Sequence, residues 1–244
     1  MKFTRKPRII SRIDVKNEFV IKGIQLEGLR KLGDPNDFAR KYFELGVDEI
    51  IFQDAVAAYY DRNSLSNIIR NAVKEVFIPI TVGGGIRKIS DITKALNSGA
   101  DKVAINTKAL QNPEFINESS KEFGSQCIVA QIDVKYENGN YICYFDNGRE
   151  SSGKNLNEWI KEIQDRGAGE ILITSIDRDG TKKGFDLNIL ESIINDIKIP
   201  LIVSGGFGNS KDCRLALENP KVDAIAPASY FHYNLGNIAD IRNN

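Results

Sequence analysis

The sequence is poor in histidine and cysteine, and its charges balance. A single histidine, His232, argues against a histidine-rich metal site and against a Ser-His-Asp triad. The three cysteines, Cys127, Cys143 and Cys213, form neither a CxxC pair nor a disulfide framework. We therefore expect the protein to reside in the reducing cytoplasm. With 33 basic residues against 33 acidic ones, the charge gives no reason to expect nucleic acid or an anionic membrane as a partner.

Long apolar runs are missing as well. No run approaches the roughly 20 apolar residues that a membrane-spanning helix needs. Residues 1–8 lack the long apolar core of a signal peptide. These absences predict a cytoplasmic protein that has no membrane partner.

Short β-rich apolar segments alternate with longer segments of helical period. We expect strands at Arg8–Val15, Glu49–Gln53, Ile78–Val82, Lys102–Ile105, Cys127–Val134, Glu170–Ser175, Leu201–Ser204 and Ala224–Ala228. We expect helices at Pro35–Leu45, Leu65–Val76, Ile89–Ser98, Pro113–Phe123, Leu156–Arg166, Leu187–Asp196 and Ser210–Glu218. This alternation predicts a parallel sheet covered by helices, which is either an eight-stranded barrel or an open doubly wound sheet.

An internal repeat decides between these two folds. Four strand segments of the first half recur in the second half, in the same order and at a spacing of about 120 residues. The repeat pairs Asp14 with Asp133 and Gly84 with Gly205, among others. Two equivalent halves close naturally into a ring, whereas an open sheet offers no such equivalence. We therefore predict one α/β domain over residues 1–244, a (β/α)8 TIM barrel built from half-barrels at about 1–122 and 123–244.

Glycine-rich turns follow the third and seventh expected strands. Gly83–Gly85 is joined by Asn106 and Thr107 after the fourth strand, and Gly205–Gly206 by Ala228 and Ser229 after the eighth. Barrel enzymes react at the C-terminal ends of their strands, and glycine lets backbone N–H groups approach phosphate oxygens. One glycine cluster alone equally fits a tight turn. Two clusters at matched strand ends predict a ligand with two phosphates, stretched across the barrel mouth.

Asp14 and Asp133 end the first and fifth expected strands, which lie on opposite sides of a barrel. Two carboxylates that flank a ligand suit general acid and general base roles. A strand-end aspartate usually caps a helix or a loop, but the symmetric pair above a glycine-lined mouth favours catalysis. Asp179 and Asp54 follow other strands, and both are interpreted as turn residues placed where they can contact the ligand.

Several motifs together are specific enough to indicate a family. They are Ile13–Lys16, Lys22–Gly23, Thr81–Ile86, Ala100–Thr107, Phe123–Gln126, Gly167–Thr181 and Ser204–Gly206. Over nearly the whole chain these segments resemble the cyclase subunits of imidazole glycerol phosphate synthase, the HisF family. The sister isomerase of histidine biosynthesis shares the half-barrel repeat, but the Asp14–Lys16 and Ala100–Thr107 motifs fit the cyclase better.

The resemblance implies a lyase that needs ammonia but no cofactor or metal. It would convert phosphoribulosyl-formimino-AICAR phosphate (PRFAR), a bisphosphate, to imidazole glycerol phosphate and AICAR. Asp14 and Asp133 would be the acid–base pair, and Lys22 would contact the substrate or close over it. The remaining assignments are Gly85, Asn106 and Thr107 for one phosphate, Gly206, Ala228 and Ser229 for the other, and Thr174 and Asp179 for the middle of the ligand.

The same resemblance implies a glutaminase (HisH-type) partner. Its ammonia would enter the barrel from the opposite face through a gate of Arg8, Glu49, Lys102 and Glu170, which begin four strands. Charged residues at a barrel rim can also simply stay hydrated, in which case they contribute little.

Three residues depart from the family's largely apolar barrel interior. Strand alternation directs Arg12, Gln53 and Gln131 inward, below the aspartates. A buried guanidinium needs a carboxylate partner, whose pKa it would lower, and it would obstruct an ammonia path. The alternative is therefore a paralogue that channels ammonia with a glutaminase and a sugar amidotransferase in surface-glycan biosynthesis, or a non-catalytic scaffold.

Overall fold

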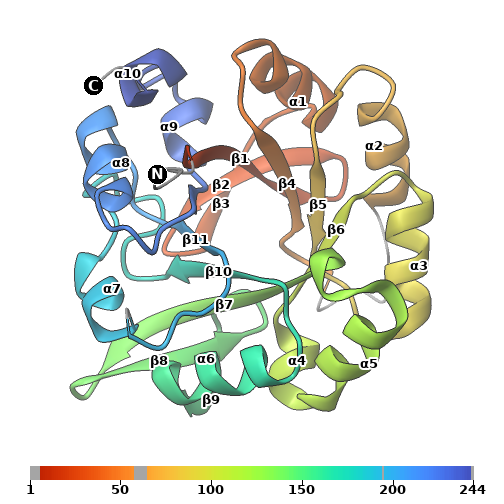
Figure 1. Ribbon diagram of the computed structural model, residues 1–244. Helices are drawn as coiled ribbons and strands as arrows, with labels where there is room; N and C mark the ends of the chain where they lie inside the picture. The colour runs from red at the N-terminus through yellow and green to blue at the C-terminus, as the bar shows by residue number, and fades with distance from the viewer. Residues whose placement is uncertain (1–5, 58–64, 194, 243–244) are drawn as a thin grey trace, which may run out of the picture.

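Parallel strands form a closed ring in the computed structural model, which describes residues 6–57, 65–193 and 195–242. Around the ring follow β1 (Arg8–Lys16), β4 (Glu49–Asp54), β5 (Ile80–Gly83), β6 (Lys102–Ile105), β7 (Ile128–Glu137), β10 (Glu170–Ser175), β11 (Leu201–Ser204) and β12 (Ala224–Ile225). β12 pairs with β1, and β10 pairs with β7, so the ring closes. The (β/α)8 barrel prediction is confirmed (Figure 1).

Helices surround the ring and connect its strands (Figure 1). They are α1 (Pro35–Glu44), α2 (Leu65–Ala72), α3 (Ile89–Asn97), α4 (Thr107–Gln111), α5 (Glu114–Phe123), α6 (Leu156–Asp165), α7 (Leu187–Ile193), α8 (Ser210–Leu217), α9 (Ser229–His232) and α10 (Ile238–Arg242). Asp34 caps α1 by accepting a hydrogen bond from the backbone N–H of Asn36, and Pro35 stands at the first helical position. No helix within the described ranges is long and apolar enough to cross a membrane.

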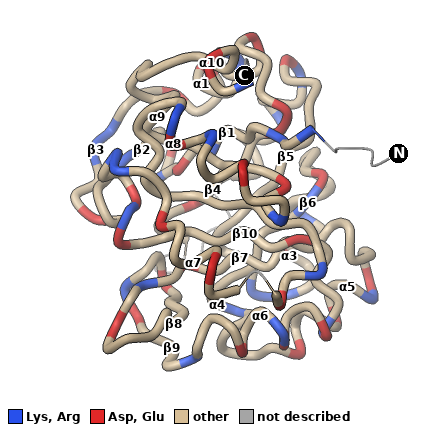
Figure 2. Tube along the Cα trace, turned by 60° about the vertical axis from the view of Figure 1, so that its left-hand side comes forward, with Lys and Arg blue, Asp and Glu red and all other residues tan. Residues whose placement is uncertain are grey.

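Two antiparallel hairpins extend the barrel beyond the predicted elements. β2 (Phe19–Ile24) and β3 (Glu27–Gly33) follow β1, while β8 (Asn140–Phe145) and β9 (Glu150–Asn155) follow β7. Both hairpins therefore grow from a strand that carries one of the paired aspartates. They lie at the same end of the barrel, on the left in Figure 2.

Several predicted boundaries differ from the structure. α2 ends at Ala72 rather than Val76, and α7 ends at Ile193; residue 194, which the predicted helix included, lies outside the described residues. β7 runs on to Glu137 because it pairs with β8. β12 ends at Ile225 because Pro227, two residues on, has no N–H to donate to a neighbouring strand.

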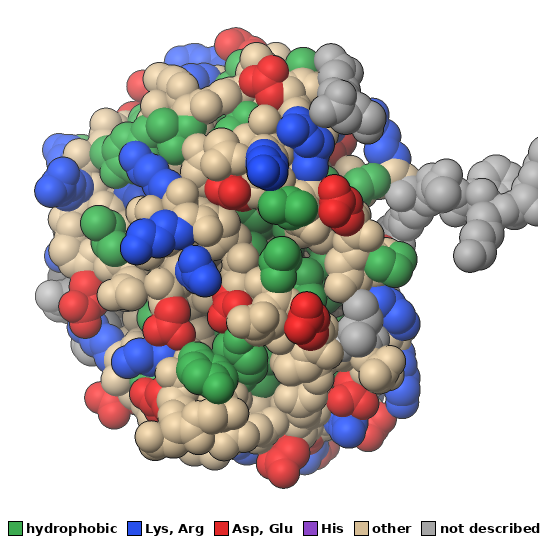
Figure 3. All heavy atoms as spheres, turned by 90° about the vertical axis from the view of Figure 1, so that its left-hand side faces the viewer, with side chains coloured by type: hydrophobic (Ala, Val, Ile, Leu, Met, Phe, Trp, Pro, Cys, Tyr) green, Lys and Arg blue, Asp and Glu red, His purple; other side chains and the backbone are tan. Residues whose placement is uncertain are grey.

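Two apolar clusters hold the barrel together. The larger one lies between the strands and the helices and includes Trp159, Tyr42 and Phe52. The smaller one fills the middle of the ring and consists of Ile10, Ile51, Ala104, Val129, Leu172, Ile202, Ala224 and Ala226. On the outside, acidic and basic residues are interspersed, without a large region of one sign in the views of Figures 2 and 3.

Candidate active site

Asp14 and Asp133 both lie inside the barrel near its mouth. β1 and β7 stand opposite each other in the ring, so the two carboxyl groups approach the interior from opposite walls. Asp14 is 6% exposed and Asp133 is 2% exposed. The charge of Arg12 acts on both carboxyl groups, which indicates that they share one buried environment.

The carboxylate of Asp14 is surrounded by cations. Its Oδ1 accepts a hydrogen bond from Arg12 Nε at 2.8 Å, and its Oδ2 lies 3.5 Å from Lys22 Nζ. Burial by itself would raise the pKa of Asp14, but the positive charges of Arg12 and Lys22 outweigh it and hold this pKa below its usual range. Asp14 is therefore a group that stays ionised.

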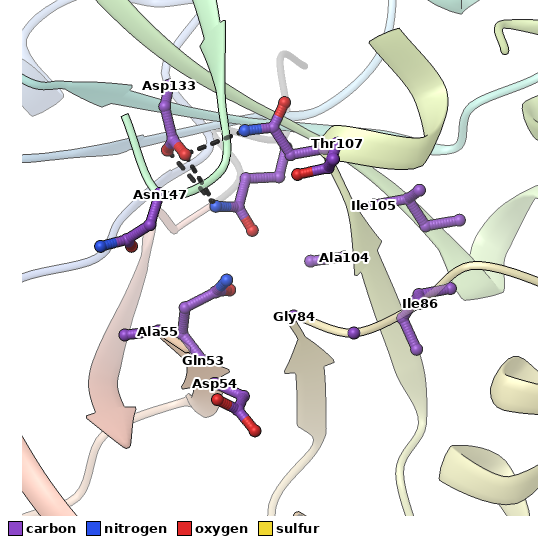
Figure 4. A pocket seen from close by; sticks show the side chains of 13 residues that line it. Gln53, Asp54, Ala55, Gly84, Ile86, Ala104, Ile105, Thr107, Asp133 and Asn147 are labelled. Carbon is purple, nitrogen blue, oxygen red and sulfur yellow. Dashed lines mark hydrogen bonds between the residues drawn. The ribbon is translucent and has the colours of Figure 1, made fainter. Parts of the chain in front are cut away.

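Asp133 has mainly neutral neighbours. Asn106 Nδ2 donates to its Oδ2 at 2.9 Å, and Gln131 Nε2 lies 3.3 Å from its Oδ1 (Figure 4). Burial raises the pKa of Asp133, and the more distant charge of Arg12 together with these amide donors offsets only part of the effect. Two carboxyl groups whose pKa values are displaced in opposite directions can take different roles in one reaction.

Arg12 is the residue that distinguishes the two aspartates. It is 2% exposed, and besides its bond to Asp14 it donates from Nη1 to Thr174 Oγ1 at 2.8 Å. Burial would lower its pKa, but the surrounding aspartates raise it, so the guanidinium is charged. The prediction that Arg12 is buried and paired with a carboxylate is confirmed, and its effect on the pKa of Asp14 has the predicted direction.

Lys22 and Asp179 form a buried ion pair across the mouth. Lys22 Nζ lies 2.6 Å from Asp179 Oδ2, and both side chains are 3% exposed. Burial would lower the pKa of Lys22, but Asp179 and Asp14 raise it. This pair fastens the β2–β3 hairpin to the loop after β10, so the hairpin is held over one side of the mouth.

The first glycine turn has the backbone geometry expected of a phosphate site. Gly84 and Gly85 have φ angles of 88° and 73°, where side chains are disfavoured. A Cβ on Gly84 would come within 2.3 Å of the backbone oxygen of Asp54. Both glycines and Thr107 line a small cavity of about 50 Å³ (Figure 4).

Asn106, which was expected to bind this phosphate, instead donates hydrogen bonds to other protein groups. Its amide nitrogen donates to Asp133 and, at 3.0 Å, to the backbone oxygen of Tyr144 in β8. The Thr107 hydroxyl lies 3.2 Å from the backbone nitrogen of Asp146 in the turn between β8 and β9. The structure thus places Asn106 as a support of Asp133, and its phosphate role stays a prediction.

The residues expected at the second phosphate include a glycine turn and a buried hydroxyl group that forms no hydrogen bond within the described part of the chain. Gly206 has a φ of 97°, and a Cβ there would come within 2.2 Å of the backbone oxygen of Gly184. Ser229 is 5% exposed, and its Oγ has no hydrogen-bond partner among the described residues. Ala228 precedes it at the start of α9. A buried hydroxyl without a partner is a costly arrangement unless a ligand completes it.

At the opposite end of the barrel, four charged side chains form a closed ring of ion pairs. Arg8 contacts Glu49 and Glu170, and Lys102 Nζ lies 3.2 Å from Glu49 and 2.9 Å from Glu170. Burial would lower the pKa of Arg8, but Glu170 and Glu49 raise it. All four predicted gate residues are therefore brought together below the apolar layer.

The sequence interpretation missed the contributions of the second hairpin, namely Tyr144 and Asp146. A signal was present, because Asn138-Gly139 between two β-rich segments is a strong indicator of a two-residue hairpin turn. In the described part of the chain, no group of three or more His, Cys, Asp or Glu side chains is placed to hold a metal ion.

A closed (β/α)8 barrel with opposed carboxyl groups at its mouth defines the class of barrel enzymes that carry their chemistry on strand ends. Residues 8–237 match the family described as histidine biosynthesis protein. The chain belongs to this family, and within it to the HisF subunits of imidazole glycerol phosphate synthase that it resembles.

The relatives match over most of their length. A HisF subunit of this synthase from Lactococcus lactis subsp. cremoris is 45% identical, over 96% of this chain and 92% of its own length. The HisF subunit of Wolinella succinogenes is 46% identical, over 96% and 93%. That of Legionella pneumophila is 48% identical, over 84% and 97%.

Proposed function

We propose that this barrel is the cyclase subunit of imidazole glycerol phosphate synthase, a lyase of histidine biosynthesis. It uses ammonia to convert PRFAR to imidazole glycerol phosphate and AICAR. One observation carries the proposal: HisF relatives are 42% to 48% identical to this chain, and it covers 92% to 97% of their length. The opposed aspartates and the two glycine turns supply the chemistry that this reaction needs.

The two aspartates divide the work in this proposal. The raised pKa makes Asp133 the stronger base of the pair, so it accepts a proton from the nitrogen that enters the reaction and returns one to the leaving group. Asp14 stays ionised, and its carboxylate holds the cationic groups of Arg12 and Lys22 in position at the mouth. Of the two aspartates predicted to be an acid–base pair, only Asp133 therefore transfers protons in this proposal.

The ends of the substrate bind at the two glycine turns. Gly85 and Thr107 supply donors to one phosphate, and Gly206, Ala228 and the free hydroxyl of Ser229 supply donors to the other. In this proposal Thr174 and Asp179 position the middle of the ligand, through Arg12 and Lys22, to which they are bonded. Asn106 acts on the substrate mainly through Asp133, whose carboxylate it holds in place.

Ammonia is supplied by a glutaminase of the HisH type that docks at the face where the strands begin. The relatives are named as subunits, which supports a complex. Phe77, in the loop before β5 at this face, is 76% exposed, and Leu45, at the end of α1, is 41% exposed. Exposed large apolar groups beside a charged ring suit a protein interface. The ring of Arg8, Glu49, Lys102 and Glu170 is the gate through which ammonia enters.

Arg12, Gln53 and Gln131 favour a second candidate, because they make the barrel interior more polar than the family pattern. This candidate is the ammonia-channelling subunit that serves a sugar amidotransferase. The test is turnover of PRFAR by the purified chain with an ammonium salt as nitrogen source. We expect imidazole glycerol phosphate and AICAR to form, and we expect Asp133→Asn to reduce kcat at least about 100-fold. A folded protein that binds a glutaminase but does not turn over PRFAR would support the second candidate.

A further inference from the structure

Two glutamine side chains lie between the apolar layer of the barrel and the aspartates. Gln53 follows Ile51 on β4, and Gln131 follows Val129 on β7, with each pair two residues apart on the inward face. Gln53 is 7% exposed and Gln131 is 3% exposed. They are the first polar groups on this side that a molecule would meet after crossing the apolar layer.

Both amide oxygens lack a hydrogen-bond donor. Gln53 Oε1 and Gln131 Oε1 are buried, and among the described residues neither accepts a hydrogen bond. They converge over Gly83, because a Cβ built on this glycine would lie 2.0 Å from Gln53 Oε1 and 3.2 Å from Gln131 Oε1. Leaving one such acceptor unsatisfied costs free energy, and two that point to the same place indicate a donor between them.

The cavity next to these oxygens connects the interior with the mouth. Its lining includes Ala104, a member of the apolar layer, as well as Gln53, Gln131 and Asp133 (Figure 4). Its volume of about 50 Å³ suits one very small molecule. On the opposite wall, Arg12 is bonded to Asp14 and Thr174, so its guanidinium fills that side.

We infer that Gln53 and Gln131 form a binding site for one molecule of neutral ammonia, immediately before it reaches the substrate. The inference rests on the proposed function. Ammonia has three N–H donors, and two of them would be accepted by the amide oxygens. Its nitrogen lone pair would remain free for attack, and the Asp133 carboxylate stands on the same side to take the proton that addition releases. Arg12 directs ammonia to this wall by closing the other.

The test compares ammonia-dependent kinetics of the purified chain with those of Gln53→Met, which keeps the side-chain length but removes the amide oxygen. Gln131→Met serves as a second variant, and Gln126→Met is the matched control, because Gln126 is exposed on the turn before β7. Gln53→Met is the cleaner variant because Gln131 also donates to Asp133. Thermal unfolding of each variant verifies that it is folded.

We expect the KM for free ammonia to rise roughly five- to tenfold in each site variant, the effect of losing about one hydrogen bond. In Gln53→Met, kcat at saturating ammonia and the KM for PRFAR should stay within about twofold of the unsubstituted values, and Gln126→Met should change nothing. An unchanged ammonia KM in a folded, active Gln53→Met protein would mean that the amides hold only water, and would overturn this inference alone. Absence of PRFAR turnover in the unsubstituted chain would overturn it together with the proposed function.

Discussion

Arg12 and Asp14 stand two residues apart on β1, and Nε of the guanidinium lies 2.8 Å from Oδ1 of the carboxylate inside the barrel. Strand alternation places both side chains on the inward face, so the ion pair is built into a single strand. Asp133, on the opposite wall, accepts its hydrogen bonds from the neutral amides of Asn106 and Gln131, and no described Lys or Arg forms an ion pair with it. Exchanging each aspartate for its amide should therefore have opposite effects on stability.

Asp14→Asn should destabilise the fold at pH 7, because it leaves the buried charge of Arg12 without its partner. The expected cost is about 3 kcal/mol, or a fall in Tm of roughly 6 °C or more for a chain of this size. Because the folded pKa of Asp14 is depressed, its contribution is present above the unfolded carboxyl pKa and is lost as the pH falls through the folded pKa. The deficit of the variant should shrink in acid, and thermal melts from pH 7 to pH 3 measure it.

Asp133→Asn should raise the Tm at pH 7, although we expect it to reduce kcat at least about 100-fold. The folded pKa of Asp133 is raised, so ionising this carboxyl opposes folding as the pH rises through the unfolded and then the folded pKa. The amide avoids that cost, and a rotated Gln131 can accept its N–H. The gain should disappear below the usual carboxyl pKa of about 4, where both forms are neutral. A lower Tm at pH 7 would contradict the raised pKa.

Arg12→Met should move the acid limb of the pH profile of kcat/KM to higher pH. The guanidinium lowers the pKa of both Asp14 and Asp133, so its removal lets burial raise both values. The reaction needs ionised carboxylates, and more alkaline solution is then required to form them. Steady-state rates with ammonium salt from pH 5 to pH 9, corrected for the free ammonia at each pH, provide the measurement. A superimposable profile would show that Arg12 does not set these ionisations.

Lys102→Met should uncouple the two activities of the complex. Lys102 bonds Glu49 and Glu170, so its loss opens the ring on one side and leaves Arg8 as the only member that bridges the two carboxylates. With the glutaminase docked, more glutamate should form per imidazole glycerol phosphate than in the unsubstituted complex. Turnover with added ammonium salt should be retained, since this ammonia can reach the mouth from solution. Unchanged stoichiometry would exclude the ring as a gate.

Ser229→Ala should weaken substrate binding without unfolding the barrel. A hydrogen bond to a charged phosphate contributes about 1.5 to 3 kcal/mol, so the KM for PRFAR should rise at least tenfold. Ser11→Ala is the matched control, because Ser11 Oγ is also buried without a partner among the described residues but lies on the outward face of β1. Equal KM values for the two variants would remove Ser229 from the phosphate site.

The repeat made the fold predictable from the sequence, and the strand period made Arg12 predictable. Asp14 and Asp133 occupy matched repeat positions, so their opposition in the ring followed once the barrel was deduced. Arg12 alternates with Asp14, and a buried guanidinium has few ways to satisfy its charge. These inferences depend on backbone geometry and on strong electrostatic rules, which hold without knowledge of the neighbouring side chains.

The role of Asn106 could not be deduced in this way. An asparagine at a strand end can donate to a phosphate or to a carboxylate, and the choice depends on how close Asp133 and the Tyr144 carbonyl lie. That proximity is set by the β8–β9 hairpin, which the strand-helix alternation concealed. Side-chain conformations in the mouth are thus determined by tertiary packing rather than by spacing along the chain.

The charged ring below the apolar layer carries two cations and two anions, so its charges sum to zero. An ammonium ion would gain no net attraction there, and it would lose its hydration among the isoleucine and alanine side chains above. Uncharged ammonia pays a much smaller cost. The barrel would accordingly distinguish neutral ammonia from the ammonium ion by protonation state rather than by size.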